Sequence, residues 1–128
     1  MRLRDTIEVR EAYVYQDAYG TMVYTWNGAF VPAANGGPFP PGPKVEVSIP
    51  AYVSTVQTSA KTSGTNLYFV EDLRAIIEAW PAVLTPLPVS DSPKRFRVIW
   101  QGKVCVFASE PLRRLLNGKT HHWTLKLA

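Results

Sequence analysis

Prolines and glycines interrupt this chain throughout, and they limit its fold more than any other feature. The 128 residues include 11 prolines and 8 glycines, and both residue types end helices and strands and favour turns. Between the turns, apolar residues repeatedly alternate with polar ones, which is typical of β-strands. We therefore expect an all-β or mainly β fold. A chain of this length predicts a single domain, residues 1–128, with a hydrophobic core.

The charge of the chain is modest. Fourteen Lys and Arg residues against ten Asp and Glu residues give a net charge of +4, and the basic residues are scattered, unlike the dense run of a dedicated nucleic-acid binder. Charged residues make up only 19%, which suggests that partners cover part of the surface. No apolar stretch reaches the roughly 18 residues of a transmembrane helix, and the N-terminus lacks the apolar run of a signal peptide. We expect a protein made in a cytoplasm and used there, or built into an assembly made there.

A predicted hairpin opens the last third of the chain. Apolar and mainly charged residues alternate over 95–100, and Gln101-Gly102 follows as a two-residue break. Glycine adopts the positive φ of a tight hairpin turn at little steric cost. Residues 103–108 are almost continuously apolar, which predicts a return strand covered on both faces.

A short helix is expected after this hairpin. Ser109 is a suitable N-cap, and Pro111 fits the first helical turn because its missing N–H costs nothing there. The leucines of segment 112–116 would form one apolar stripe, and Asn117-Gly118 is a typical helix stop. The alternating segment 121–127 then predicts a last strand.

The first half of the chain predicts further strands. Segments 5–15 and 21–26 flank the turn residues 17–20, and segment 44–49 alternates strictly. Pro50 should end that strand or mark a sheet edge, because proline cannot donate to a ladder.

Two stretches are predicted to be irregular. Segment 35–43 contains four prolines and three glycines in nine residues, so it suits a stiff spacer or a docking arm. Ser54–Asn66 holds seven Ser or Thr residues in thirteen. It is interpreted either as a surface loop or weakly formed β-ribbon, or as a mobile loop with a role in an assembly, since long loops inside a domain are often functional.

Segment 71–80 fits two structures. Leu73, Ile76, Ile77 and Trp80 share one face of a helix, and acidic residues stand at its start. The β-branched pair at 76 and 77 suits a strand equally well. We take the helix as the expectation and the strand as the alternative.

The sequence offers no catalytic set. It lacks a Gly-rich phosphate loop, a GxSxG elbow and an HExxH motif. His121 and His122 are neighbours on a predicted strand and so should point to opposite faces, which disfavours a shared metal. Cys105 lies in an apolar strand and reads as a core residue, and Arg113-Arg114 should lie on the exposed face of the short helix. We expect neither an enzyme nor a metal or cofactor site.

Three motifs in order carry a resemblance. The first is an N-terminal strand followed by Asp17-Ala-Tyr-Gly20 and Trp26, and the second is the hairpin core Val98–Val104. The third is the ending Gly118-Lys-Thr-His-His-Trp-Thr-Leu. In this order they resemble the head-to-tail stopper, or head-closure, proteins of long-tailed phages, especially phages of actinobacteria. In that family a strand is expected over 71–80.

The resemblance implies a small β-barrel subunit with one or two short helices, which forms a homo-oligomeric, hexameric ring below the portal and its adaptor. The ring would close the DNA-filled head, present the surface for the tail terminator or tail tube, and leave a lumen for double-stranded DNA. In this family a long loop lines or obstructs the lumen. Ser54–Asn66 matches that loop by position and composition, and its candidate gating residues are Lys61, Thr62, Ser63 and Gly64. The implied location is the virion, with no membrane and no cofactor.

Two functions of different classes follow. The first is a ring-forming virion connector, whose near neighbours are an adaptor and a tail-completion protein. The second is a free-standing nucleic-acid-binding β-barrel. A connector should assemble into rings and bind free DNA weakly, whereas a binding module should retard oligonucleotides with a steep dependence on salt. The scattered basic residues favour the connector.

Overall fold

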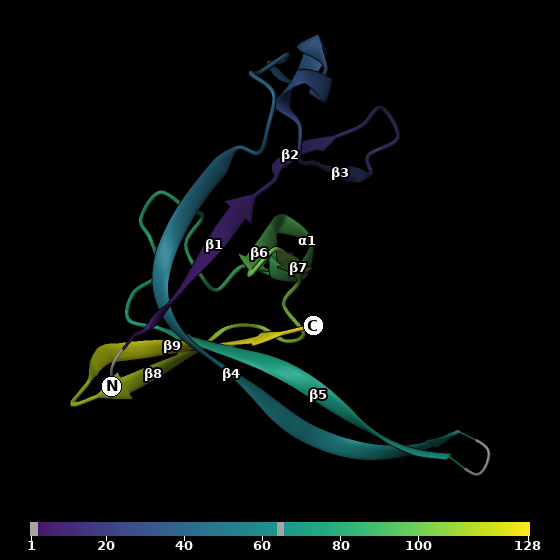
Figure 1. Ribbon diagram of the computed structural model, residues 1–128. Helices are drawn as coiled ribbons and strands as arrows, with labels where there is room; N and C mark the ends of the chain where they lie inside the picture. Colours follow the sequence, from purple (N-terminus) through teal and green to yellow (C-terminus); the bar gives the residue numbers. More distant parts are fainter. Residues whose placement is uncertain (1–2, 64–65) are drawn as a thin grey trace.

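The computed structural model describes residues 3–63 and 66–128 and is mainly β (Figure 1). The mainly β prediction is confirmed. The strands are β1 Asp5–Glu11, β2 Tyr13–Gln16, β3 Met22–Thr25, β4 Val45–Ser63, β5 Asn66–Ile77, β6 Phe96–Trp100, β7 Lys103–Cys105, β8 Leu112–Leu116 and β9 Lys119–Leu127. One single-turn helix, α1 Ser92–Arg95, and two 3₁₀ turns, η1 Gly28–Phe30 and η2 Ala33–Asn35, complete the described elements.

Seven of these strands form one antiparallel sheet in the order β7-β6-β1-β4-β5-β9-β8. Strand β1 pairs with β4 on one side and with β6 on the other, so that Val9 lies opposite both Val47 and Val98. Because side chains alternate along a strand, this register sends one apolar residue from each strand to the same face. The alternation predicted for 44–49 and 95–100 is therefore the alternation that fills the interior.

The core draws its residues from most strands of this sheet. Its buried members come from six strands and two loops: Ile7, Val9, Ile49, Ala51, Val53, Ala75, Ile77, Leu84, Phe96, Val98, Cys105, Phe107, Leu125 and Leu127. The ring of Trp80 packs edge-on against Phe96 at 5.1 Å and lies 6.3 Å from Phe107. Segment 78–91, which carries this tryptophan, thereby covers one side of the core.

The segment that follows β7 approaches the end of β9. The N–H of Val106 donates to the carbonyl of Ala128 at 3.0 Å, and the N–H of Ala128 donates back at 2.9 Å. A third backbone bond joins Ala108 to Lys126 at 2.9 Å. These bonds connect the two distant sides of the seven-stranded sheet, although the paired strands themselves do not form a closed barrel.

An insertion between β1 and β4 forms a second unit of structure. Strands β2 and β3 make a separate two-stranded sheet, which stands apart from the large sheet in Figure 1. The chain returns to the large sheet through a bond from the N–H of Lys44 to the carbonyl of Glu11 at 3.0 Å. The proline-rich segment 35–43 belongs to this insertion, where the ring of Phe39 stacks on Tyr13 at 4.8 Å.

Both expected helices are wrong. Residues 66–77 form β5, which pairs with β4 and β9 and buries Ala75 and Ile77 at every second position. Two neighbouring strands outweigh the weak helical pattern here, since propensity yields to tertiary pairing. The second expected helix is β8, and Asn117-Gly118, with φ of 52° and 76°, forms the turn of the β8–β9 hairpin and not a helix stop.

Of the two expectations for Pro50, the end of a strand is wrong, since β4 continues to Ser63. Pro50 lies opposite Thr6 of β1, but the ladder between β4 and β5 begins only at Tyr52. Proline therefore stands where β4 has a partner on one side only, and its missing N–H can face the unpaired side.

Candidate assembly surfaces

The longest feature of the molecule is a two-stranded arm. We define the arm as residues 54–63 of β4 and 66–72 of β5, which pair with each other beyond the reach of β1 and β9. It extends away from the rest of the sheet in Figure 1. At about 3.3 Å per residue, ten residues of β4 span roughly 30 Å.

The predicted gating residues lie at the end of this arm. Lys61, Thr62 and Ser63 belong to β4 and lie opposite Tyr68, Leu67 and Asn66 of β5. Gly64 lies outside the described residues. The loop expected over Ser54–Asn66 is thus a β-ribbon over its described part, which agrees with the ribbon alternative for the backbone.

A second surface is the outer edge of β8. All five of its residues are exposed, and among the described residues no strand pairs with its outer side. The leucines at 112, 115 and 116 are 43%, 55% and 58% exposed, and Arg113 and Arg114 stand between them. The two arginines were expected on the outside of a helix, and they instead occupy a free strand edge.

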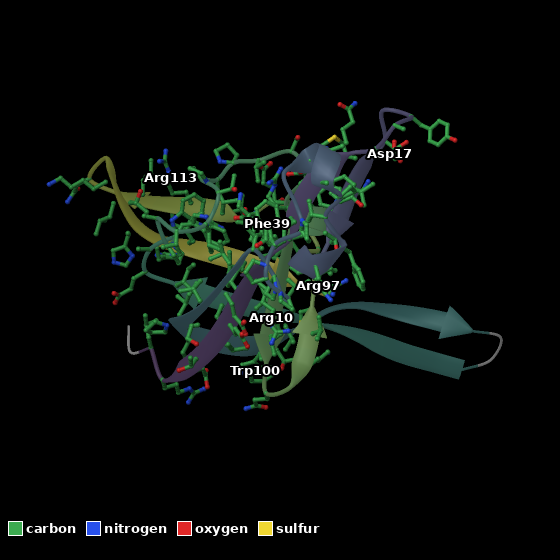
Figure 2. The ribbon with its side chains drawn as sticks, turned by 90° about the horizontal axis from the view of Figure 1, so that it is seen from above. Arg10, Asp17, Phe39, Arg97, Trp100 and Arg113 are labelled. Carbon is green, nitrogen blue, oxygen red and sulfur yellow. The ribbon has the colours of Figure 1, made fainter. Side chains whose placement is uncertain are left out.

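A third surface lies on the insertion. Its exposed large apolar side chains are Tyr19, Met22, Phe30 and Phe39, and Tyr19 is 95% exposed. The turn that carries Tyr19 is fixed by Asp17, whose side chain accepts the N–H groups of Tyr19 and Thr21, both at 2.9 Å. The predicted turn at 17–20, where Figure 2 labels Asp17, therefore holds an exposed aromatic ring on a turn that is fixed by hydrogen bonds.

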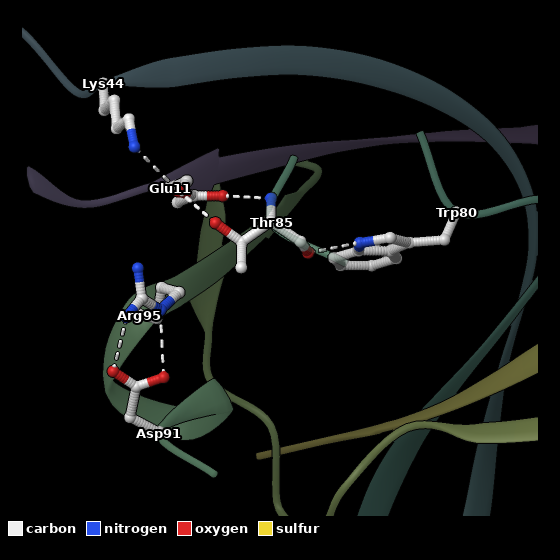
Figure 3. Close-up of polar contacts among 6 residues, drawn as sticks. All are labelled: Glu11, Lys44, Trp80, Thr85, Asp91 and Arg95. Atoms are coloured by element: carbon white, nitrogen blue, oxygen red, sulfur yellow. Dashed lines mark hydrogen bonds and ion pairs between the residues drawn. The ribbon is translucent and has the colours of Figure 1, made fainter. Parts of the chain in front are cut away.

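A buried carboxylate ties the core-covering segment to the sheet (Figure 3). Glu11 is 1% exposed, and it accepts the N–H of Thr85 at 2.7 Å and the hydroxyl of Thr85 at 2.9 Å. The ammonium of Lys44 lies 3.7 Å from the same carboxylate. The carbonyl of Thr85 in turn accepts the indole N–H of Trp80 at 2.9 Å. Each member has a partner, which indicates a structural network.

A second polar cluster joins the insertion to α1. Arg95 donates two hydrogen bonds to Asp91, both at 2.9 Å, and Tyr24 of β3 donates its hydroxyl to the same carboxylate at 2.7 Å. The hydrogen bonds from Arg95 are the main reason that the pKa of Asp91 lies below its usual value; burial opposes this shift and the bond from Tyr24 adds to it. Burial and the bond to Asp91 raise the pKa of Tyr24.

Neither the pocket beside segment 78–87 nor the environment of Cys105 favours a reactive group. A pocket of about 390 Å³ lies between segment 78–87 and β9, and Glu78 is its one ionisable lining residue among those described. Cys105 is buried, and burial raises the pKa of its thiol, which disfavours the reactive thiolate. Among the described residues, no three metal-ligating side chains cluster.

The histidine pair departs from expectation. The Nδ1 atoms of His121 and His122 lie 2.7 Å apart, and the rings meet edge-on at 5.0 Å, so the two side chains do not point to opposite faces. Strand alternation fails at this point because the β8–β9 ladder shifts register next to it, between Arg114 and Leu115. Burial, then the neighbouring His121 and Arg114, lower the pKa of His122.

Comparisons of this chain with protein-family models, with curated proteins and with solved structures found no match. In the part of the chain that the structure describes, no helix has the length and apolar character needed to span a membrane. The Glu11–Thr85 contact could not be predicted from sequence patterns, since 74 residues separate the partners and no motif connects them.

Proposed function

We propose that this protein is a structural subunit of a phage virion, which forms a ring at the head–tail connector, closes the DNA-filled head, and provides the tail attachment surface and the DNA conduit. The observation that carries the proposal is the projecting β4–β5 arm on a sheet whose β8 edge is uncovered. Such edges are ready templates for pairing with another chain. The resemblance of the three sequence motifs to stopper proteins points the same way.

The large sheet suits the wall of a small barrel. Strands β7, β6, β1, β4, β5 and β9 follow one another in the sheet, and the backbone bonds between 106–108 and 126–128 bring the first strand of this series to the last. In the proposed barrel, these bonds act as the seam. Closing a sheet in this way removes most of its edges and leaves the hairpins to make contacts.

The arm takes the role of the long lumen loop. Its described residues pair with each other and form no ladder with the core strands β1 and β9. A movement of the arm therefore disturbs the core little. Lys61 near its end can meet a DNA phosphate without the dense positive charge that would hold DNA tightly. The proposed partners are further copies of the chain, a portal adaptor, a tail terminator or tail tube protein, and genomic double-stranded DNA.

The size of the purified full chain tests the ring. We expect light scattering after gel filtration to give a multiple of the subunit mass and negative-stain images to show rings with a central hole. At physiological salt, free double-stranded oligonucleotides should not be retarded. A protein that stays monomeric up to high concentration and binds oligonucleotides with steep salt dependence would instead be the free-standing nucleic-acid-binding barrel.

A shortened arm tests the conduit. We would remove residues 61–68, which leaves the paired residues Ala60 and Phe69 as the end of the ladder, and close the ribbon with Asn-Gly, a favoured hairpin turn. The fold should survive, because the core strands keep all their partners, and filled heads carrying the variant should leak DNA. Heads that retain DNA as the unmodified particles do would contradict the gating role of the arm.

A further inference from the structure

The edge strand β8 and the arm are complementary in sequence. Strand β8 reads Leu-Arg-Arg-Leu-Leu over 112–116, and the part of β5 in the arm reads Asn-Leu-Tyr-Phe-Val-Glu-Asp over 66–72. In an antiparallel pairing that sets Arg114 opposite Glu71, Arg113 meets Asp72, and Leu115 and Leu116 meet Val70 and Phe69. Opposite charges and apolar pairs directly across a ladder are the favourable cross-strand combinations.

Both partners of this pairing have a free side. In the described part of the chain, residues 66–72 pair with β4 only, since β9 begins its ladder with β5 at Leu73. Strand β8 pairs with β9 only, and its backbone groups on the other side meet no described strand. Each edge therefore has unpaired N–H and C=O groups that another strand can satisfy.

The two edges cannot meet within one copy. Strand β9 separates β8 from β5 in the sheet order, and the arm leaves the molecule on the side away from the β8–β9 hairpin in both Figure 1 and Figure 2, where Arg113 marks β8. A contact between them thus joins different surfaces of two copies. Such a heterologous contact generates a ring if its rotation closes.

We propose that the occupant of the β8 edge is the arm of a neighbouring copy, which adds residues 69–72 of its β5 to the sheet as an antiparallel strand. This inference rests on the proposed ring and assigns the strands that join its subunits. The register is set by the acidic residues of the arm and the arginines of β8. A slip of one residue would flip every side chain to the other face and so break the pairing of opposite charges. The exposed leucines of β8 are then covered by the apolar residues of the arm.

Charge reversal on each edge tests the contact. One variant carries Arg113→Glu and Arg114→Glu, and the other carries Glu71→Lys and Asp72→Lys. Each alone should weaken self-association at least about tenfold, because like charges then face each other across the docked strands. A chain with all four substitutions restores the opposite charges at every contact and should assemble again.

Mixing the two variants gives the sharpest result. In an equal mixture, each reversed edge can pair with the reversed arm of the other variant, and each unmodified edge with an unmodified arm. Association should therefore return in the mixture although neither component associates alone. The control is Lys94→Glu on α1, an exposed residue away from both edges, whose reversal changes the charge by two units, half of the change in each double variant. It should assemble as the unmodified chain does.

The fold of each variant is checked by circular dichroism, and Leu115→Lys provides a second substitution at an exposed position of β8 that should also weaken association. Rings that form equally well in all variants would overturn this interface and leave the connector function standing. An unmodified chain that remains monomeric would overturn the ring itself, and with it this contact.

Discussion

Replacing Glu11 by alanine should detach the segment that covers the core. The carboxylate is 1% exposed and accepts two hydrogen bonds from Thr85, at 2.7 and 2.9 Å. A hydrogen bond to a charged group contributes about 1.5–3 kcal/mol. Lys44 adds little, because its side chain is 51% exposed and such pairs are weak. We expect Glu11→Ala to lower the free energy of unfolding by about 3–5 kcal/mol, because two such bonds are lost and the N–H of Thr85 is left without its acceptor.

Glutamine at position 11 separates the effect of the charge from that of the side-chain shape, because it keeps the shape and removes the charge. Its carbonyl oxygen can still accept the N–H of Thr85, so Glu11→Gln should cost only about 1–2 kcal/mol. Urea unfolding followed by circular dichroism gives both values, and hydrogen exchange at the Thr85 amide should quicken in the alanine variant because its acceptor is gone. The control is Glu46→Gln, at an exposed carboxylate on β4, which should change stability little.

The reasoning is refuted if Glu11→Ala costs less than about 1 kcal/mol, a value typical of surface substitutions. It is also refuted if the exchange of Thr85 stays as slow as in the unmodified chain. In either case the loop holding Trp80 would be anchored by its apolar contacts alone.

Three further tests, with five substitutions, address other parts of the structure. The pKa of Asp91 is lowered in the native state, chiefly by Arg95. The ionised carboxylate therefore stabilises the fold fully above the usual aspartate pKa, and this stabilisation is lost as the pH falls through the lowered pKa. Asp91→Asn should remove this part of the pH dependence of the melting temperature. Gly102→Val should lower the melting temperature more than Gly102→Asn, since φ is +77° and asparagine tolerates that region. Phe96→Ala should lower the free energy of unfolding in urea by about 3–5 kcal/mol. Trp100→Ala would be expected from the sequence to cost as much, but it should cost less because Trp100 is only half-buried. Equal costs for the two variants would contradict this assignment of the core.

The sequence predicts strands best where a local turn fixes them. Gln101-Gly102 forms the turn between β6 and β7, with φ of 50° and 77°, and the alternation on the first side of it is clear. The strands around residues 17–20 follow the same logic, since Asp17 bonds the turn that it begins. In both places the partners are close in sequence, so the information needed is local.

The failures concern residues whose partners are distant. The helical spacing of segment 71–80 is a real pattern. In the fold, however, Ala75 lies opposite Leu125 of β9 and Val53 of β4. Neither neighbour can be predicted from the residues around position 75. Ser109 and Pro111 suit a helix start, but the leucines that follow them lie in β8, which pairs with β9 as a hairpin. Capping signals identify a place where a helix can begin and do not require one.

The failure at β8 also explains why its surface matters. An amphipathic helix over 112–116 could have packed its leucines against the sheet. As a strand at the sheet edge, the segment instead leaves all five of its residues exposed. Proteins usually protect such an edge with charges, and Arg113 and Arg114 are charges of one sign only. A single sign resists pairing between two identical edges and admits a strand that carries the opposite sign, as the acidic residues at 71 and 72 do. The composition of β8 therefore disfavours a symmetric dimer through this strand and favours the head-to-tail contact of the proposed ring.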